Sequence, residues 1–153
     1  MVLRVSVDNR DVQAALSRLS SHTTNLQPAF KNIGEYLVLR TQERFDDQQD
    51  PKGQRWQPLK ASTLARKTRL RKILKILQQD GDLRTSIAYQ ATNRDVSIGT
   101  NRVYGAIHQF GGMAGRGRRV RIPPRPYLGV DDADRAEIVE IIEEHLRPPS
   151  TGQ

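Results

Sequence analysis

The sequence contains no cysteine, few aromatic residues and no long apolar run. Without cysteine, the chain can form no disulfide bond and has no thiolate to act as a nucleophile or to bind a metal. No stretch approaches the roughly 18 consecutive apolar residues of a membrane-spanning helix. The N-terminus also lacks the apolar region of a signal peptide. We therefore expect a soluble protein that folds in the cytoplasm and has no membrane partner.

Basic residues outnumber acidic ones, and the two signs are unevenly distributed. The formal net charge is +8, but residues 131–153 contain seven acids and two bases, which leaves +13 on residues 1–130. This asymmetry indicates either nucleic acid near the basic part or head-to-tail contact between copies of the chain. A soluble basic domain with neither partner is the remaining alternative.

The first part of the chain is predicted to be mainly helical. Leu3, Val5 and Val7 alternate with polar residues, which indicates a half-buried strand. Residues 12–19 then place apolar side chains on one helical face. Pro28 suits the first turn of a second and longer helix, because a missing N–H costs nothing there. The apolar stripe of that helix comprises Phe30, Ile33, Leu37 and Phe45, widened by Tyr36 and Leu39.

Short strands and helices follow. A basic helix is expected from about residue 62 to residue 77, and residues 80–82 form a turn. The alternating runs 86–89 and 96–98 predict an antiparallel hairpin, and residues 103–110 predict a brief helix. Residues 122–128 must be extended, because their three prolines forbid a helix. Asp131 and Asp132 cap a final helix, whose apolar stripe comprises Ile138, Ile141, Ile142 and Leu146.

These elements predict a single α+β domain over residues 1–146. Its small, mostly antiparallel sheet packs against the long helix and the C-terminal helix. Residues 113–121 are rich in glycine and arginine and are expected to form a flexible loop. Residues 147–153 are expected to be a frayed tail, because two prolines end the final helix.

Signals for enzymatic chemistry are weak. The chain has no phosphate-binding GxxxxGK[ST], no HExxH and no GxSxG. No two of the three histidines, His22, His108 and His145, have the local spacing of metal ligands. The carboxylate pairs at 46–47 and at 80 and 82 fit turns and caps better than a cation site. We expect no enzyme, cofactor or metal, although a site assembled from distant residues stays an alternative.

Two basic segments and one aromatic residue are candidates for contacts with partners. The basic helix could lie along phosphates or simply face solvent. Glycine gives flexibility to the segment that carries Arg116, Arg118, Arg119 and Arg121, and arginine side chains bind phosphate or carboxylate through paired donors. That segment therefore fits either DNA or an acidic neighbour. Trp56 lies in a polar loop, where it could anchor a partner or fold back onto the core.

The middle and end of the chain resemble the virion-morphogenesis family of Mu-like phages, which includes tail-completion proteins. The resemblance rests on the order and spacing of several segments between residues 53 and 146. These segments are GQRWQPL (53–59), TLARK (63–67), DGDLRTSI (80–87), VSIGT (96–100), YGAIHQFGG (104–112) and IPPRPYLG (122–129), followed by an acidic helix. Two segments depart from the pattern: the arginine-rich stretch after residue 112, and Gln79-Asp80-Gly81, where a threonine is expected before the glycine.

The resemblance implies a non-enzymatic structural protein that completes the tail or neck of a phage particle, so that head and tail join stably. It would be made in the host cytoplasm and reside in the virion, beside tail and head–tail connector proteins. We expect copies to form a homo-oligomeric ring. In that ring Glu137, Glu140 and Glu144 are the candidate acidic contact, and packaged DNA in the channel is a further candidate partner. The main alternative is a basic nucleic-acid-binding protein.

Overall fold

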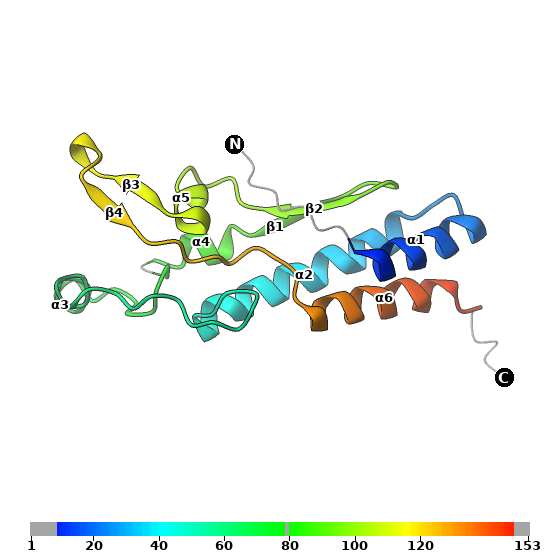
Figure 1. Cartoon of the computed structure of the whole chain (residues 1–153), viewed down its shortest axis with the longest axis horizontal. Helices are drawn as coiled ribbons and strands as arrows, with labels where there is room; N and C mark the ends of the chain where they lie inside the picture. Colours follow the sequence, from blue (N-terminus) through cyan, green and yellow to red (C-terminus); the bar gives the residue numbers. More distant parts are fainter. Residues whose placement is uncertain (1–8, 79, 149–153) are drawn as a thin grey trace.

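The computed structural model describes residues 9–78 and 80–148, which form helices and two small hairpins (Figure 1). The helices are α1 (Arg10–His22), α2 (Gln27–Asp47), α3 (Ala61–Arg69), α4 (Asp82–Thr85), α5 (Gly105–Phe110), the 3-10 turn η1 (Arg116–Arg118) and α6 (Asp132–Leu146). The strands are β1 (Ala88–Ala91), β2 (Val96–Gly99), β3 (Gly112–Ala114) and β4 (Val120–Ile122). The predicted α+β class is confirmed. No helix in the described ranges is long and apolar enough to cross a bilayer.

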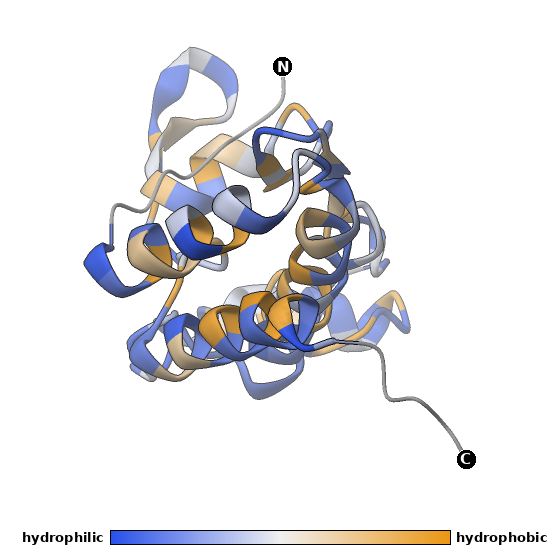
Figure 2. Ribbon diagram, turned by 90° about the vertical axis from the view of Figure 1, so that its right-hand side faces the viewer, coloured by the Kyte–Doolittle hydropathy of each residue, from blue (hydrophilic) through white to orange (hydrophobic). Residues whose placement is uncertain are grey.

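Helices α1, α2 and α6 pack together over one apolar core, as their hydrophobic faces in Figure 2 show. The helix ends follow from local chemistry. The Oδ1 of Asn9 accepts hydrogen bonds from the N–H groups of Asp11 (3.1 Å) and Val12 (3.2 Å), which caps α1. Pro28 lies in the first turn of α2, as predicted. The buried members of this core are Ala15, Leu19, Ala29, Phe30, Ile33, Leu37, Ile138, Ile141 and Ile142.

The hairpin β1–β2 lies against the long helix α2 and is antiparallel, as the sequence predicts. Gly34 of α2 makes this approach possible, because a Cβ there would lie only 2.3 Å from the ring of Tyr89. A second core cluster follows at the end of α2, where the rings of Phe45 and Tyr127 lie 5.1 Å apart. This cluster consists of Phe45, Trp56, Ile76, Leu83, Ile87, Tyr127 and Leu128.

A buried carboxylate joins α6 to α2. Asp134 is fully buried, and its carboxylate accepts hydrogen bonds from the Nε of Arg40 (2.8 Å) and the hydroxyl of Tyr36 (2.8 Å). A guanidinium nitrogen of Arg44 and the N–H of Asp131 also donate to it. Burial alone would raise the pKa of the Asp134 carboxyl, but these hydrogen bonds and the charge of Arg44 lower it well below its usual range. The group is therefore ionised and fully bonded.

Two segments differ from their predictions. The basic helix expected as far as residue 77 ends at Arg69, and Arg71 adopts a left-handed conformation (φ 52°). Tertiary contacts explain this: the N–H of Ile76 donates to Gln48 at the end of α2 (2.9 Å), and the Ile76 side chain is buried. Residues 113–121, expected to be a loop, instead carry the paired strands β3 and β4 around a short turn. Their flexibility stays a prediction.

Smaller differences concern the sheet, one side chain and the termini. The described residues form two separate two-stranded sheets, where the sequence predicts one small sheet. Leu39 is 60% exposed and does not widen the buried stripe of α2. The predicted N-terminal strand at residues 3–7 lies outside the described residues, as do residues 149–153 of the predicted frayed tail. Helix α6 ends at Leu146, just before the two prolines, as predicted.

The substitution Asp134→Asn tests the buried network. It removes the charge that the largely buried guanidinium of Arg44 requires, so we expect the free energy of unfolding to fall by about 3–5 kcal/mol. Urea denaturation measures this loss in the free energy of unfolding. Asp132→Asn is the matched control in the same helical turn, because the Asp132 side chain is 97% exposed and should contribute less than about 1 kcal/mol. Equal losses in the two variants would contradict the assignment.

The same carboxylate predicts a pH dependence. The pKa of Asp134 is lower in the folded protein than the value of about 3.9 expected in the unfolded chain. Its stabilising contribution is therefore complete above that value and is lost as the pH falls through the folded pKa. We expect the free energy of unfolding, measured by urea denaturation across a pH series, to decrease below about pH 4. Asp134→Asn should show a shallower decrease, and identical curves would refute this origin.

Candidate assembly surfaces

An arginine-bearing hairpin projects from one end of the molecule (Figure 1). We call residues 112–122 the arginine hairpin; in it β3 and β4 pair in antiparallel register, with Met113 opposite Arg121. Gly115 and Gly117 have φ values of 75° and 71°, which let the chain reverse tightly. The predicted contact residues Arg116, Arg118, Arg119 and Arg121 are all exposed. None of them forms an ion pair within the described part of the chain, so their charges are available to a partner.

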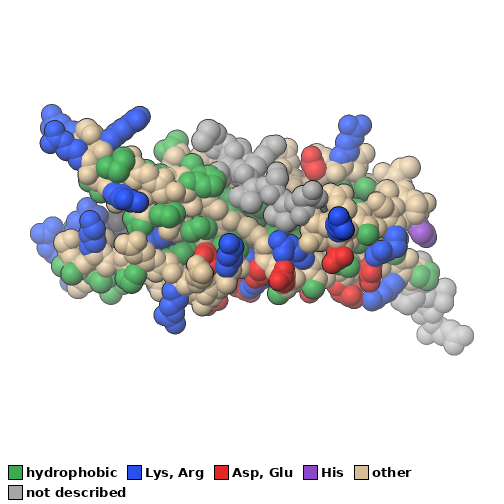
Figure 3. Space-filling view, viewed as in Figure 1, with side chains coloured by type: hydrophobic (Ala, Val, Ile, Leu, Met, Phe, Trp, Pro, Cys, Tyr) green, Lys and Arg blue, Asp and Glu red, His purple; other side chains and the backbone are tan. Residues whose placement is uncertain are grey.

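Apolar side chains are exposed beside this hairpin. Val103 is 90% exposed and Phe110 64% exposed, and Met113 and Val120 of the hairpin are about half exposed. More exposed apolar residues lie on α3 and the segment after it, namely Leu64, Leu70, Ile73 and Leu74. Figure 3 shows green apolar and blue basic side chains interspersed at this end of the molecule. Exposed aromatic, Met and Arg residues together are typical of protein interfaces.

The acidic face of α6 lies in the other half of the molecule (Figures 1 and 3). Glu137, Glu140 and Glu144 are exposed there, as the sequence predicts for a contact surface. Glu140 pairs with Arg147 on the same segment (2.9 Å). Glu137 and Glu144 form no ion pair with any described residue. The structure thus keeps the acidic candidates apart from the arginine hairpin within one chain.

Trp56 belongs to the core. Its side chain is 4% exposed, its Nε1 donates to the carbonyl of Pro126 (2.8 Å), and its ring meets Phe45 edge-on with centroids 5.5 Å apart. Of the two alternatives that the sequence left open, the structure shows packing against the core. The side chain is not available as an exposed anchor for a partner in this conformation.

Two of the histidines and the carboxylate of Asp46 contact groups within the fold. The Nδ1 atoms of His22 and His145 lie 2.9 Å and 2.8 Å from carbonyl oxygens one turn earlier in their helices. Asp46 pairs with Arg84 (2.9 Å), an interaction that lowers the Asp46 pKa. Across residues 9–78 and 80–148, no three histidine or acidic side chains converge in a way that could hold a metal ion.

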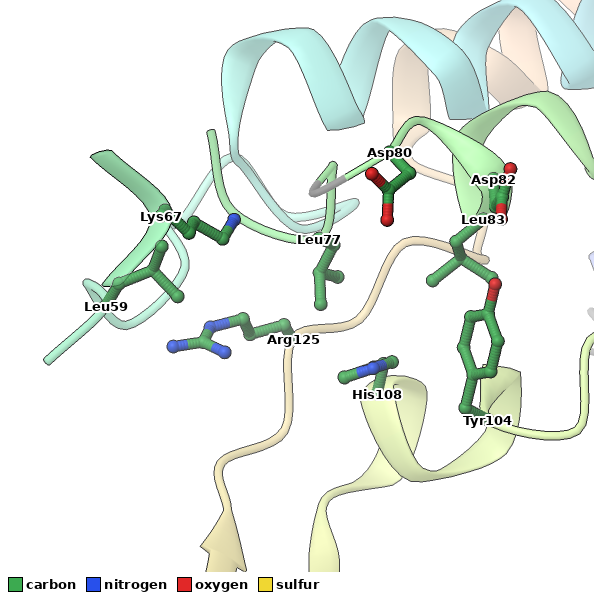
Figure 4. A pocket seen from close by; sticks show the side chains of 9 residues that line it. All are labelled: Leu59, Lys67, Leu77, Asp80, Asp82, Leu83, Tyr104, His108 and Arg125. Atoms are coloured by element: carbon green, nitrogen blue, oxygen red, sulfur yellow. The ribbon is translucent and has the colours of Figure 1, made fainter. Parts of the chain in front are cut away.

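Sequence reasoning missed one cleft of about 390 Å³ between α3, α5 and the extended segment 122–128 (Figure 4). His108 lines it, and its pKa is lowered, first by burial of the imidazole and then by the charge of Arg125. The lining residues are Leu59, Lys67, Leu77, Asp80, Asp82, Leu83, Tyr104, His108 and Arg125. The available signal was Arg125, a charged residue held between prolines in a segment that must be extended.

The fold and these surfaces describe a small basic α+β protein with exposed apolar and charged patches of the type that protein assemblies use. The chain belongs to the phage virion morphogenesis family, whose model matches residues 7–147. The resemblance identified in the sequence is therefore confirmed, and it extends over the N-terminal helices as well.

Two relatives match nearly the whole chain. Mu-like prophage FluMu G protein 2 of Haemophilus influenzae is 31% identical over 147 residues, which cover 95% of this chain and 97% of that protein. The putative capsid assembly protein G of Escherichia phage Mu is 32% identical over 147 residues, which cover 94% of each chain. No solved structure matches this chain.

The burial of Trp56 predicts how its fluorescence responds to a quencher. Because Trp56 is the only tryptophan and is buried, its emission should resist iodide quenching and stay unchanged when oligomers form. The variant Trp56→Phe/Val103→Trp is the control, since Val103 is 90% exposed and a tryptophan there should be quenched readily. Equal quenching of the two proteins would show that Trp56 is not part of the core in solution.

Proposed function

We propose that this chain is a non-enzymatic structural subunit that completes the tail or neck of a Mu-like phage particle and supports stable joining of head and tail. In this proposal copies of the chain form a closed ring in the virion. The observation that carries it is the separation of two charged surfaces. The arginine hairpin projects from one end, and the exposed side chains of Glu137, Glu140 and Glu144 lie on α6 in the other half (Figure 1). Family membership and the name of the phage Mu relative support a role in particle assembly.

Complementary patches on different faces of one subunit favour a heterologous contact. In such a contact the hairpin of one copy meets α6 of the next, and the pair keeps one free hairpin and one free α6. Repetition closes into a ring when the rotation between copies divides the circle, and otherwise produces a filament. Exposed side chains such as Phe110 and Met113 beside the arginines would supply the apolar centre of the contact. The charges would supply register and salt dependence.

Charge reversal on α6 tests this contact. Glu137→Lys/Glu144→Lys changes two exposed, unpaired carboxylates and should abolish the oligomer by placing like charges opposite the arginines. The mass of the purified protein, measured by light scattering at low and high salt, gives the outcome. If the isolated wild-type subunit is monomeric, the measurement is made after tail proteins are added.

Glu35→Lys/Asp47→Lys is the matched control, because it makes the same charge change on α2 at two exposed residues. This variant should assemble like the wild type. Reversing Arg118 and Arg119 to Glu in the α6 variant should restore part of the assembly. A wild type that never assembles, or an α6 variant that assembles normally, would contradict the proposed contact.

A nucleic-acid-binding protein is the second candidate, and the four exposed arginines of the arginine hairpin favour it. Each phosphate contact would add a salt-dependent contribution to the binding free energy. This candidate would be supported over the ring by a protein that stays monomeric when tail proteins are added. The monomer should also bind duplex DNA tightly, with an affinity that falls steeply as the salt concentration rises. DNA binding by the assembled ring alone would instead place the hairpin tip near packaged DNA in a channel.

A further inference from the structure

The cleft between α3 and α5 contains two buried cations that have no carboxylate of residues 9–78 or 80–148 within ion-pairing distance. Lys67 and Arg125 are only 5% and 7% exposed. The Nζ of Lys67 donates to the carbonyl of Lys75 (3.0 Å). Arg125 donates to the carbonyls of Gln57 (2.9 Å) and Pro58 (3.3 Å). In the described part of the chain, neither forms a salt bridge, although buried charges are ordinarily paired.

The positive charges of Lys67 and Arg125 are unfavourable in this cleft, as the pKa values of both groups show. Burial lowers the pKa of Lys67, and the neighbouring charges of Arg125 and Arg66 lower it further. Burial likewise lowers the pKa of Arg125. Asp80 lies on the opposite wall, where it pairs with Lys72 at 2.5 Å, and its charge offsets only part of this effect. An anion entering the cleft beside Lys67 and Arg125 would relieve both groups.

The shape and lining of the cleft favour a single carboxylate over a nucleic-acid backbone. Figure 4 shows Lys67 and Arg125 on one side, and Asp80 and Asp82 on the other, with Leu77 between them. Duplex DNA carries one negative charge per about 1.7 Å of its axis. Such a dense row of phosphates would meet the two aspartates as well as the two cations. One carboxylate on an otherwise neutral or apolar segment avoids that repulsion.

We propose that this cleft receives a glutamate side chain of α6, Glu137 or Glu144, from a second copy of the chain. Both glutamates are exposed and unpaired among the described residues, and α6 of the same subunit extends through the other half of the molecule (Figure 1). The cleft adjoins the arginine hairpin, since Arg125 follows β4 and His108 precedes β3. The inference rests on the proposed ring and adds to it the pocket in which one acidic side chain is held.

Zero-length crosslinking with a carbodiimide tests the inference on the assembled protein. The reagent joins a carboxylate to an amine only when the two are in contact. Assemblies formed from an equal mixture of ordinary and 15N-labelled chains should yield Lys67 joined to Glu137 or Glu144, with both isotopes present in the same peptide pair. The link between Lys72 and Asp80, which lie 2.5 Å apart in one chain, is the internal control for the reaction.

The variant Lys67→Met gives an independent measure. It removes the charge and keeps much of the length of the side chain, and Trp56 fluorescence checks that it folds. We expect the concentration at half-assembly to rise at least about 30-fold, because a buried carboxylate would lose its partner. Lys60→Met, which removes an exposed charge at the same end of the molecule, should leave it nearly unchanged.

The outcomes separate the two proposals. Assemblies that form but crosslink α6 only to residues outside the cleft, with Lys67→Met assembling normally, overturn the cleft assignment and leave the ring intact. A protein that forms no assembly, alone or with tail proteins, overturns the ring itself. If Lys67→Met weakens binding to a short DNA duplex and leaves assembly unchanged, the cleft is a phosphate site and the inference is wrong.

Discussion

The carboxylate of Asp134 determines where the C-terminal helix lies, and the presentation of the acidic face of α6 depends on that placement. It is buried at the start of α6, where Arg40, Arg44 and Tyr36 of α2 all donate to it. These bonds orient α6 so that Ile138, Ile141 and Ile142 enter the core. The opposite side of α6 then faces solvent, and its glutamates form the acidic face. A single buried ion network therefore links the stability of the fold to the presentation of one candidate contact.

The other end of the molecule is built differently. Trp56, Phe45 and Tyr127 form an aromatic core there, and the segments that leave it carry exposed apolar and basic side chains. The exposed apolar side chains are the unusual part of this surface, because apolar patches exposed to water are typical of sites that contact a partner. The polarity of the subunit, acidic at α6 and basic at the hairpin and α3, gives head-to-tail association a physical basis.

The elements with strong local signals could be predicted from the sequence. Apolar periodicity and caps identified α1, α2 and α6, and alternation identified β1–β2, because these patterns report burial directly. The basic helix was predicted too long because Ile76 packs at the end of α2, a tertiary contact with no local signal. The β3–β4 pairing was not predicted, because the glycine and arginine content of this segment is typical of a loop. The cleft could not be predicted, because Lys67, His108 and Arg125 come from three separate segments.

The most direct test of the ring is a cryo-electron microscopy map of phage particles assembled in cells that produce this chain. We expect a ring of copies at the tail or neck. In that ring the acidic face of α6 in each subunit should contact the arginine hairpin and adjoining cleft of the next subunit. A particle that lacks the chain, or a ring whose subunits meet through other faces with α6 exposed, would contradict it.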